Sequence, residues 1–286
     1  MTEPPANVAE PTPGRQPFES LTLVLPAFNE EARLGPVLDE LFGYLRRRGG
    51  PQREGAPASE NLPDSIRVLV VDDGSTDGTA DLVRARPEAA PEVRPAGTTG
   101  PWRGAWLELL TVAHGGKGAA VRAGMLAADS QVVVFSDADM ATPPDQIPGL
   151  LEALGTADIA LGSRIQPDGS DMRRTQPGFR RLLGKLFHAI AAIWVTGPVR
   201  DTQCGFKGFR RAAAHDLFAR QRITSIVFDV ELIYLARQRG YRLAIVPIRW
   251  FDRRGSRMQA SAGLAARVVW DLFRIPLIHR RVRRRA

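Results

Sequence analysis

The chain has 286 residues, 44% of them hydrophobic and 24% charged, which is enough for one large α/β domain or two small ones. Its net charge of +8 favours anionic partners, and its single cysteine excludes an internal disulfide, which suits a reducing compartment. No run of 18 uninterrupted apolar residues predicts a membrane-spanning helix; the most apolar stretch, 182–199, is broken by Lys185 and His188.

Predicted strands and helices alternate through the first 165 residues. Residues 1–19 are rich in proline and lack the apolar core of a signal peptide, so we expect a disordered tail. The segments expected to be regular are strand 21–28, helix 30–48, strand, turn and helix within 66–85, helix 117–128, strand 131–139, helix 143–154 and strand 158–164. This alternation predicts a mostly parallel sheet with helices on both faces. We expect 49–65 to be a loop, and 86–113 shows no clear pattern.

Polar residues cluster where three of the predicted strands end. The clusters are PAFNEE (26–31), VDDGSTDGT (71–79) and SDADM (136–140). Sheets of this kind bind ligands at the carboxyl ends of their strands. We therefore expect these side chains to share one crevice.

Asp137 and Asp139 form a D-x-D pair at the end of a predicted strand. Mg²⁺ often takes one or two carboxylates together with substrate phosphates, so the pair suits a divalent cation. Alternatively, the two aspartates only cap a turn.

The aspartate pair Asp72–Asp73 and the GGKG sequence at 115–118 both suit a nucleotide. One of Asp72 and Asp73 is expected to cap the turn at Gly74, leaving the other to accept hydrogen bonds from a base or a ribose, although both having structural roles is the alternative. The GGKG sequence at 115–118 places Lys117 at the start of a helix, where a phosphate would fit, without the spacing of a P-loop.

Several motifs together resemble a known family. The strings LPAFNEEARL, VVDDGSTDGTADLV, GKGAAVRAGM and SDADMATPPDQI resemble the family 2 glycosyltransferases of the GT-A fold. Members of that family use nucleotide-diphosphate sugars and usually a divalent metal. The resemblance runs from about residue 20 to about 260, so it implies a GT-A domain over 20–260.

Strings in the second half of the chain resemble a narrower group within this family. The strings GSR (162–164), RDTQCGFKGFRR (200–211), FDVELIYLARQRGYRLAIVPIRW (228–250) and RGSRM (254–258) are similar to dolichyl-phosphate β-glucosyltransferases and related polyprenyl-phosphate sugar synthases. This implies an inverting transfer from UDP-glucose to a polyprenyl phosphate. The alternatives are a GDP-mannose donor, a soluble hydroxyl acceptor, or a non-catalytic nucleotide-sugar-binding protein. The N-terminal membrane helix usual in eukaryotic members is not seen here.

The resemblance also implies roles for individual residues. Mg²⁺ or Mn²⁺ is expected on Asp139 with Asp137 nearby, while Lys117 and Arg164 either face the leaving diphosphate or pair with local carboxylates. The residues expected to hold the nucleoside are Pro26, Asn29, Glu30, Asp72 and Asp73.

The acceptor side depends on what attacks the sugar. Asp201 is expected beside the acceptor, as a base for a hydroxyl or as an orienting group for a phosphate, which is already largely ionised at neutral pH; alternatively it caps a turn. Gln203 and Lys207 would steer donor or acceptor, and Arg257 would meet an anionic acceptor.

Two further features complete the motif region. We expect Glu231 to face the site, with Asp229 as a cap or a supporting group. Cys204 has no histidine within its motif, so we expect a packed thiol and not a nucleophile.

The final segment, 261–286, has apolar residues at helical spacing followed by five arginines within 280–285. Such a basic amphipathic segment can lie on an anionic bilayer, which fits a lipid acceptor and a cytoplasmic enzyme peripheral to the inner face of the membrane. The alternatives are a solvated tail or an arm for nucleic acid. We expect no nucleic-acid partner, because the aromatic residues do not form a base-stacking platform.

Overall fold

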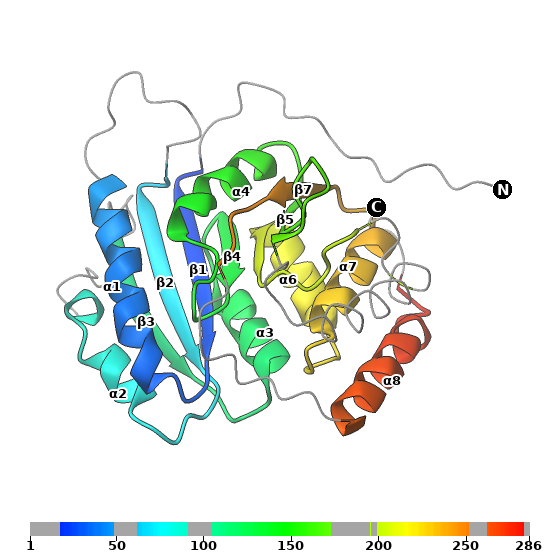
Figure 1. Ribbon diagram of the computed structural model, residues 1–286, viewed down its shortest axis with the longest axis horizontal. Coiled ribbons are helices and arrows are strands. Elements are labelled where there is room, and N and C mark those ends of the chain that lie inside the picture. The colour runs from blue at the N-terminus through cyan, green and yellow to red at the C-terminus, as the bar shows by residue number, and fades with distance from the viewer. Residues whose placement is uncertain are drawn as a thin grey trace.

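The computed structural model describes residues 18–48, 62–90, 104–172, 195, 199–251 and 262–282. Within these ranges a seven-stranded sheet has the order β3-β2-β1-β4-β6-β5-β7, with helices packed on both faces (Figure 1). The predicted α/β architecture is therefore confirmed. None of the helices in these ranges combines the length and the hydropathy that crossing a bilayer requires.

The strands are β1 (Ser20–Ala27), β2 (Ser65–Asp72), β3 (Gly104–Thr111), β4 (Val132–Ser136), β5 (Ile159–Ser163), β6 (Phe206–Arg210) and β7 (Leu243–Pro247). The helices are α1 (Glu31–Arg48), α2 (Thr79–Arg84), α3 (Lys117–Ala127), α4 (Ile147–Leu154), α6 (Arg211–Arg220), α7 (Phe228–Arg239) and α8 (Ala262–Ile278), with short 3₁₀ turns η2 (Pro87–Ala89) and η4 (Pro144–Gln146). Strands β1 to β4 pair in parallel, β6 runs antiparallel to both β4 and β5, and β5 is parallel to β7.

Alternate residues of each buried strand enter two separate cores. On β1, Leu23 packs in the core that α1 and α4 cover, whereas Val24 packs in the core that α3, α6 and α7 cover. Helix α3 comes very close to the sheet, because a Cβ atom on Gly124 would overlap the side chains of Val24 and Val71. This close approach brings the first turn of α3 near the strand ends.

Three strands were not predicted from the sequence, namely β3, β6 and β7, the last of which lies within the 228–250 string. Strand β3 lies in the 86–113 region, at an edge of the sheet, and its partial burial along most of its length explains the missing periodicity. Strand β6 is only five residues long and lies inside the 200–211 motif. Strand β4 ends at Ser136, earlier than predicted, so Asp137 and Asp139 belong to the following turn.

Helix α8 packs at the far end of the molecule from β3. Its Leu272 and Ile275 are buried with Val195, Ile223 and Val227 in a third, smaller apolar cluster. This confirms a helix within the predicted 261–286 segment. Parts of several predictions lie outside the described residues, namely 1–17, most of 182–199, Arg257 and Arg283–Arg285.

Candidate functional site

The loops that follow β1 and β2 are hydrogen-bonded to each other. The backbone N–H of Asn29 donates to Ser75 Oγ (2.9 Å), and Asn29 Oδ1 accepts from the N–H of Thr76 (2.8 Å). Asn29 adopts a left-handed conformation with φ 55°, which asparagine tolerates better than most residues. The first two polar clusters of the sequence therefore form one unit.

The other residues predicted in the first cluster have local contacts. Pro26 lies near the end of β1, beyond Val24, where the β4 pairing ends, so its missing N–H weakens the sheet little. The carboxylate of Glu30 pairs with Arg33 at 2.5 Å. Their predicted contact with a nucleoside stays a prediction.

Asp72 and Asp73 are both buried but have different partners. Asp72 Oδ1 accepts a hydrogen bond from the N–H of Ser75 (3.0 Å), which confirms the capping role expected of one member of the pair. The two carboxylate oxygens of Asp73 accept from the N–H groups of Gly115 (2.8 Å) and Gly116 (2.9 Å). Asp73 therefore fixes the turn that immediately precedes Lys117.

Lys117 and Asp137 meet at the end of β4. Lys117 Nζ lies 2.5 Å from Asp137 Oδ1. The backbone around Asp137 is fixed by Gly205, whose carbonyl accepts from the Asp137 N–H at 3.0 Å. A Cβ atom on Gly205 would overlap the Asp137 carboxylate. Glycine at 205 thus lets the D-T-Q-C-G-F-K loop pack against the D-x-D turn.

The D-x-D turn carries an excess of negative charge. Burial and the neighbouring charge of Asp137 raise the pKa of Asp139, whose Oδ1 accepts from the N–H of Ala141 (3.0 Å). Burial alone would lower the pKa of Lys117, but the carboxylates of Asp137, Asp229 and Asp139 outweigh it and raise that pKa. One lysine thus lies within the field of three carboxylates.

The same turn fits a hard divalent cation. Asp137 Oδ1 is buried and accepts no well-aligned hydrogen bond in the described part of the chain, although Lys117 Nζ is close to it. The described residues contain no cluster of three or more histidine, cysteine, aspartate or glutamate side chains arranged for a metal. Two carboxylates, with substrate phosphate oxygens completing the shell, are nevertheless a set that Mg²⁺ or Mn²⁺ accepts.

Arg164 and Asp201 form a buried bidentate ion pair. Arg164 Nη2 lies 2.6 Å from Asp201 Oδ1, while Arg164 Nε and its backbone N–H both donate to Asp201 Oδ2 (2.9 and 2.8 Å). The Asp201 side chain is only 1% exposed. Despite burial, which acts in the opposite direction, these contacts with Asp201 raise the pKa of Arg164. The alternative of local pairing is therefore the one seen for Arg164, and a carboxylate held in this way is a weak base.

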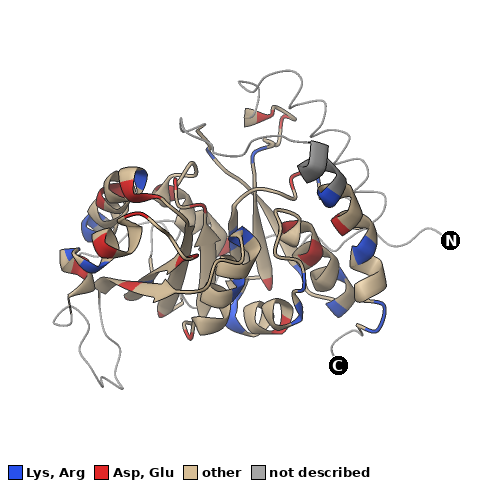
Figure 2. Cartoon of the chain, turned by 90° about the horizontal axis from the view of Figure 1, so that it is seen from below, with Lys and Arg blue, Asp and Glu red and all other residues tan. Residues whose placement is uncertain are grey.

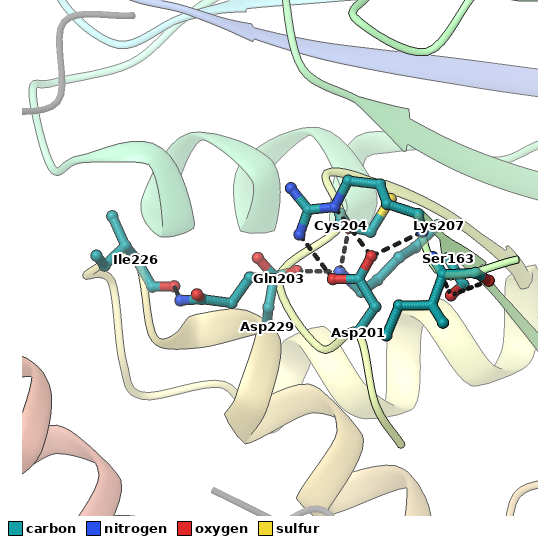
Figure 3. Close-up of polar contacts among 9 residues, drawn as sticks. Ser163, Asp201, Gln203, Cys204, Lys207, Ile226 and Asp229 are labelled. Carbon is teal, nitrogen blue, oxygen red and sulfur yellow. Dashed lines mark hydrogen bonds and ion pairs between the residues drawn. The ribbon is translucent and has the colours of Figure 1, made fainter. Parts of the chain in front are cut away.

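Lys207 does not face the open side of the site, contrary to the prediction that it steers a substrate. Its side chain is completely buried, and Nζ donates to the carbonyl of Cys204 (2.5 Å) and to Asp229 (2.7 Å), as Figure 3 shows. Burial raises the pKa of Asp229, with Lys207 and Lys117 opposing it. A fully buried, paired ammonium holds the loop together instead of contacting a ligand.

The prediction that Glu231 faces the site was wrong, whereas Asp229 has the supporting role expected of it, paired with the buried Lys207. Asp229 lies among the charges near Lys117, whereas the carboxylate of Glu231 accepts from the N–H groups of Arg222 and Ile223 (2.9 Å each), away from the D-x-D turn. Both open α7, and residues two apart on a helix point to different sides, which a sequence pattern alone does not orient.

Gln203 and Cys204 complete the motif loop. Gln203 extends toward α7 and donates to the carbonyl of Ile226 at 3.4 Å (Figure 3). Burial, with the charge of Asp201 adding to it, raises the pKa of Cys204 to about 12, which confirms the expected packed thiol.

Two groups near the site were not predicted from the sequence. Phe28 is 39% exposed, and its ring stacks on His114 with centroids 4.4 Å apart, beside Asp73. Arg33 lies near enough to Asp139 for its charge to lower the pKa of that carboxyl, although burial wins. Phe28 and Arg33 lie within the LPAFNEEARL string and His114 directly precedes GGKG, but the sequence does not show that the fold brings these side chains together at the strand ends.

The chain matches the family model described as glycosyl transferase family 2 over residues 22–218. It is 34% identical to a dolichyl-phosphate beta-glucosyltransferase of Trichomonas vaginalis, over 91% of this chain and 71% of that relative. It is 31% identical to the dolichyl-phosphate beta-glucosyltransferase of Homo sapiens, over 85% of this chain and 70% of that relative.

Solved structures agree on the fold. Glucosyl-3-phosphoglycerate synthase from Mycobacterium tuberculosis, crystallised with Mn²⁺, UDP and glucosyl-3-phosphoglycerate, superposes with a TM-score of 0.59 at 18% identity, covering 90% of this chain and 80% of that one. At that identity the likeness establishes the GT-A fold alone. With the family match and the two relatives, it shows that this chain is a member of glycosyltransferase family 2, with sequence similarity to dolichyl-phosphate β-glucosyltransferases.

Proposed function

We propose that the chain is an inverting glycosyltransferase that moves glucose from UDP-glucose to a polyprenyl phosphate. The donor and acceptor follow the names of relatives that share about a third of its residues over most of its length. The observation that carries the proposal is the charge arrangement at the end of β4. There Asp137 and Asp139 lie beside Lys117, a set of groups suited to a cation and a diphosphate.

The charged residues would act on the leaving group. A divalent metal held by Asp137 and Asp139 would supply charge neutralisation at the diphosphate. Lys117 would leave Asp137 for a diphosphate oxygen as negative charge develops there, which is stabilisation by a preorganised cation. Asp73 supports this step by fixing the Gly115–Gly116 turn from which Lys117 projects.

The acceptor side suits a nucleophile that needs no base. Asp201 is engaged by three donors of Arg164, so its main role would be to hold the guanidinium in place. Arg164 Cζ lies 5.7 Å from the ring centre of Trp250. The guanidinium N–H groups of Arg164 that do not donate to Asp201 would orient an anionic acceptor. A phosphate monoester, with a second pKa of about 6, is already ionised at neutral pH.

The nucleoside would bind over the β1 and β2 ends. Phe28 and His114 present an exposed aromatic pair there, on which a base would stack. Asn29 and Pro26 shape the same edge of the sheet, next to the buried Asp72 and Asp73.

The lipid acceptor implies a place at a membrane, and α8 offers the surface for it. Trp270, Phe273 and Leu277 are 67%, 45% and 69% exposed and recur at helical spacing. Arginines occur along this helix and in the turn after it, toward the end marked C in Figure 2, namely Arg267, Arg274, Arg280 and Arg281. An apolar stripe with flanking cations would rest on an anionic bilayer at its cytoplasmic face.

The test is a transfer assay with the purified full chain. UDP-[¹⁴C]glucose or GDP-[¹⁴C]mannose is supplied with a polyprenyl phosphate and Mn²⁺ or Mg²⁺, and the product is partitioned into organic solvent. We expect label in the organic phase with UDP-glucose. Label there only with GDP-mannose would change the donor, a water-soluble product would overturn the lipid acceptor, and no turnover of any nucleotide sugar would overturn the proposal.

A further inference from the structure

The segment 221–226 lies between α6 and α7 and contacts the first turn of α3. The N–H of Gly118 donates to the carbonyl of Thr224 (3.0 Å), and Gln221 Nε2 donates back to the carbonyl of Gly118 (2.9 Å). The two backbones are so close that a Cβ atom on Gly118 would overlap Thr224. Because Lys117 precedes Gly118, this segment fixes the backbone position from which the Lys117 side chain projects.

Helix α8 holds the same segment from the other side through two polar contacts, one partly buried and one fully buried. Ser225 Oγ donates to Asp271 Oδ2 at 2.7 Å, and Asp271 is only 5% exposed. Near the end of the helix, His279 Nε2 lies 2.6 Å from Glu231 Oε1, with the two side chains 3% and 0% exposed. Glu231 is the residue whose carboxylate accepts from Arg222 and Ile223.

These contacts form one continuous series from α8 to the lysine. Buried, charge-assisted hydrogen bonds are stronger and more directional than apolar contacts, so they fix position as well as add stability. Apolar packing of Leu272 and Ile275 would by itself hold α8 on the body of the protein. The contacts of Asp271 and His279 would then serve mainly to orient the 221–226 segment.

We propose that α8 positions Lys117: Asp271 and His279 hold the 221–226 segment against the first turn of α3, so the helix that offers the exposed apolar stripe also sets the geometry of the site. The catalytic meaning of this arrangement rests on the proposed function, whereas its structural part does not. Asp271 and His279 are positioning residues, since they act on Lys117 only through the segment.

The experiment compares three α8 variants of the full chain. Asp271→Leu removes the acceptor for Ser225, Asp271→Asn keeps an acceptor oxygen in the same place, and Trp270→Ser alters only the exposed stripe. Two quantities are measured, namely hydrogen exchange of the amides at 117–121 and kcat/KM for the donor with a short-chain acceptor in detergent. Thermal melting of each variant shows whether it is folded.

We expect Asp271→Leu to speed exchange at Gly118 by about fivefold or more and to lower kcat/KM by about tenfold. Asp271→Asn should restore both values to within about twofold of the parent chain, and Trp270→Ser should leave the exchange of the 117–121 amides unchanged. If Asp271→Leu does not fold, Ser225→Ala removes the same contact with a smaller change and decides the matter.

Unchanged exchange at 117–121 in a folded Asp271→Leu or Ser225→Ala chain would overturn the positioning. Faster exchange with undiminished kcat/KM would overturn its effect on Lys117. A parent chain that turns over no nucleotide sugar would defeat the proposed function, and the exchange measurement would still decide whether α8 fixes the turn.

Discussion

Lys117 Nζ and Asp137 Oδ1 lie 2.5 Å apart, joining the turn held by Asp73 to the turn held by Gly205. Each partner comes from a different motif, and the contact exists only because α3 packs closely on the sheet. The lysine is 36% exposed at its side chain, so it remains accessible to an anionic ligand.

Replacing Lys117 should therefore impair the chemistry more than the fold. We expect Lys117→Met to lower kcat by about 10²-fold or more, the loss typical of removing one preorganised electrostatic group. Lys117→Arg keeps the charge and should retain more of the activity. The measurement is kcat with saturating donor for both variants, and equal losses in the two would contradict a role for charge at this position.

The ionised Asp139 side chain should destabilise the folded chain when no cation is bound. Burial and the charge of Asp137 raise the pKa of Asp139 in the folded chain, so the ionised carboxylate opposes folding. Protonated Asp139 therefore stabilises the fold fully below the ordinary aspartate pKa. This stabilisation is lost as the pH rises through the pKa of Asp139 in the folded chain. At neutral pH without metal, Asp139→Asn should raise Tm by about 2 °C or more.

Mn²⁺ supplies the control for this prediction. The ion should raise the Tm of the parent chain by mass action and leave that of Asp139→Asn unchanged. A lower Tm for Asp139→Asn in metal-free buffer, or an equal response of both chains to Mn²⁺, would count against Asp139 as a metal ligand.

The sequence predicted the residues of the D-x-D turn, Lys117 and the strands β1, β2, β4 and β5, because these depend on local motifs and on strand periodicity. It did not predict that Lys207 is buried against Asp229, since a pairing between a strand and a helix 22 residues away leaves no local pattern. Strand β3 was missed for a related reason: an edge strand that is half-buried on both faces shows no alternation.

Gly205 should be intolerant of even one methyl group. In Gly205→Ala the new Cβ would overlap the Asp137 carboxylate, which must then turn away from Lys117. We expect kcat/KM to fall about tenfold or more, as for other small displacements of a reacting group. Gly169→Ala is a matched control, since nothing lies within 4 Å of a Cβ there, although its positive φ adds a small strain. Full activity in Gly205→Ala would show that the carboxylate need not be held where it lies.

Asp201 should act through Arg164 and not as a base. Asp201→Asn keeps one acceptor oxygen for Arg164 but removes the opposite charge, so we expect kcat/KM to fall about tenfold with the shape of the pH profile unchanged. A general base would instead leave its mark as an acid limb that disappears in the variant. The profile should be recorded for the parent and the variant with the same phosphate acceptor. Loss of the acid limb would assign the base role to Asp201.

The exposed stripe of α8 should govern binding to lipid surfaces. Trp270→Ser combined with Leu277→Ser removes the two most exposed large apolar side chains among residues 267–278 of that helix, and neither residue is buried in the apolar cluster beneath it. We expect co-sedimentation with vesicles of phosphatidylcholine and phosphatidylserine to weaken about tenfold or more, because each buried side chain contributes roughly 1.5–3 kcal/mol. Binding of the parent should also fall as salt is raised, since the arginines around the stripe are screened. Undiminished binding of the double variant would show that another surface of the chain contacts the lipid. Binding that does not change with salt would show that the arginines do not contribute to this contact.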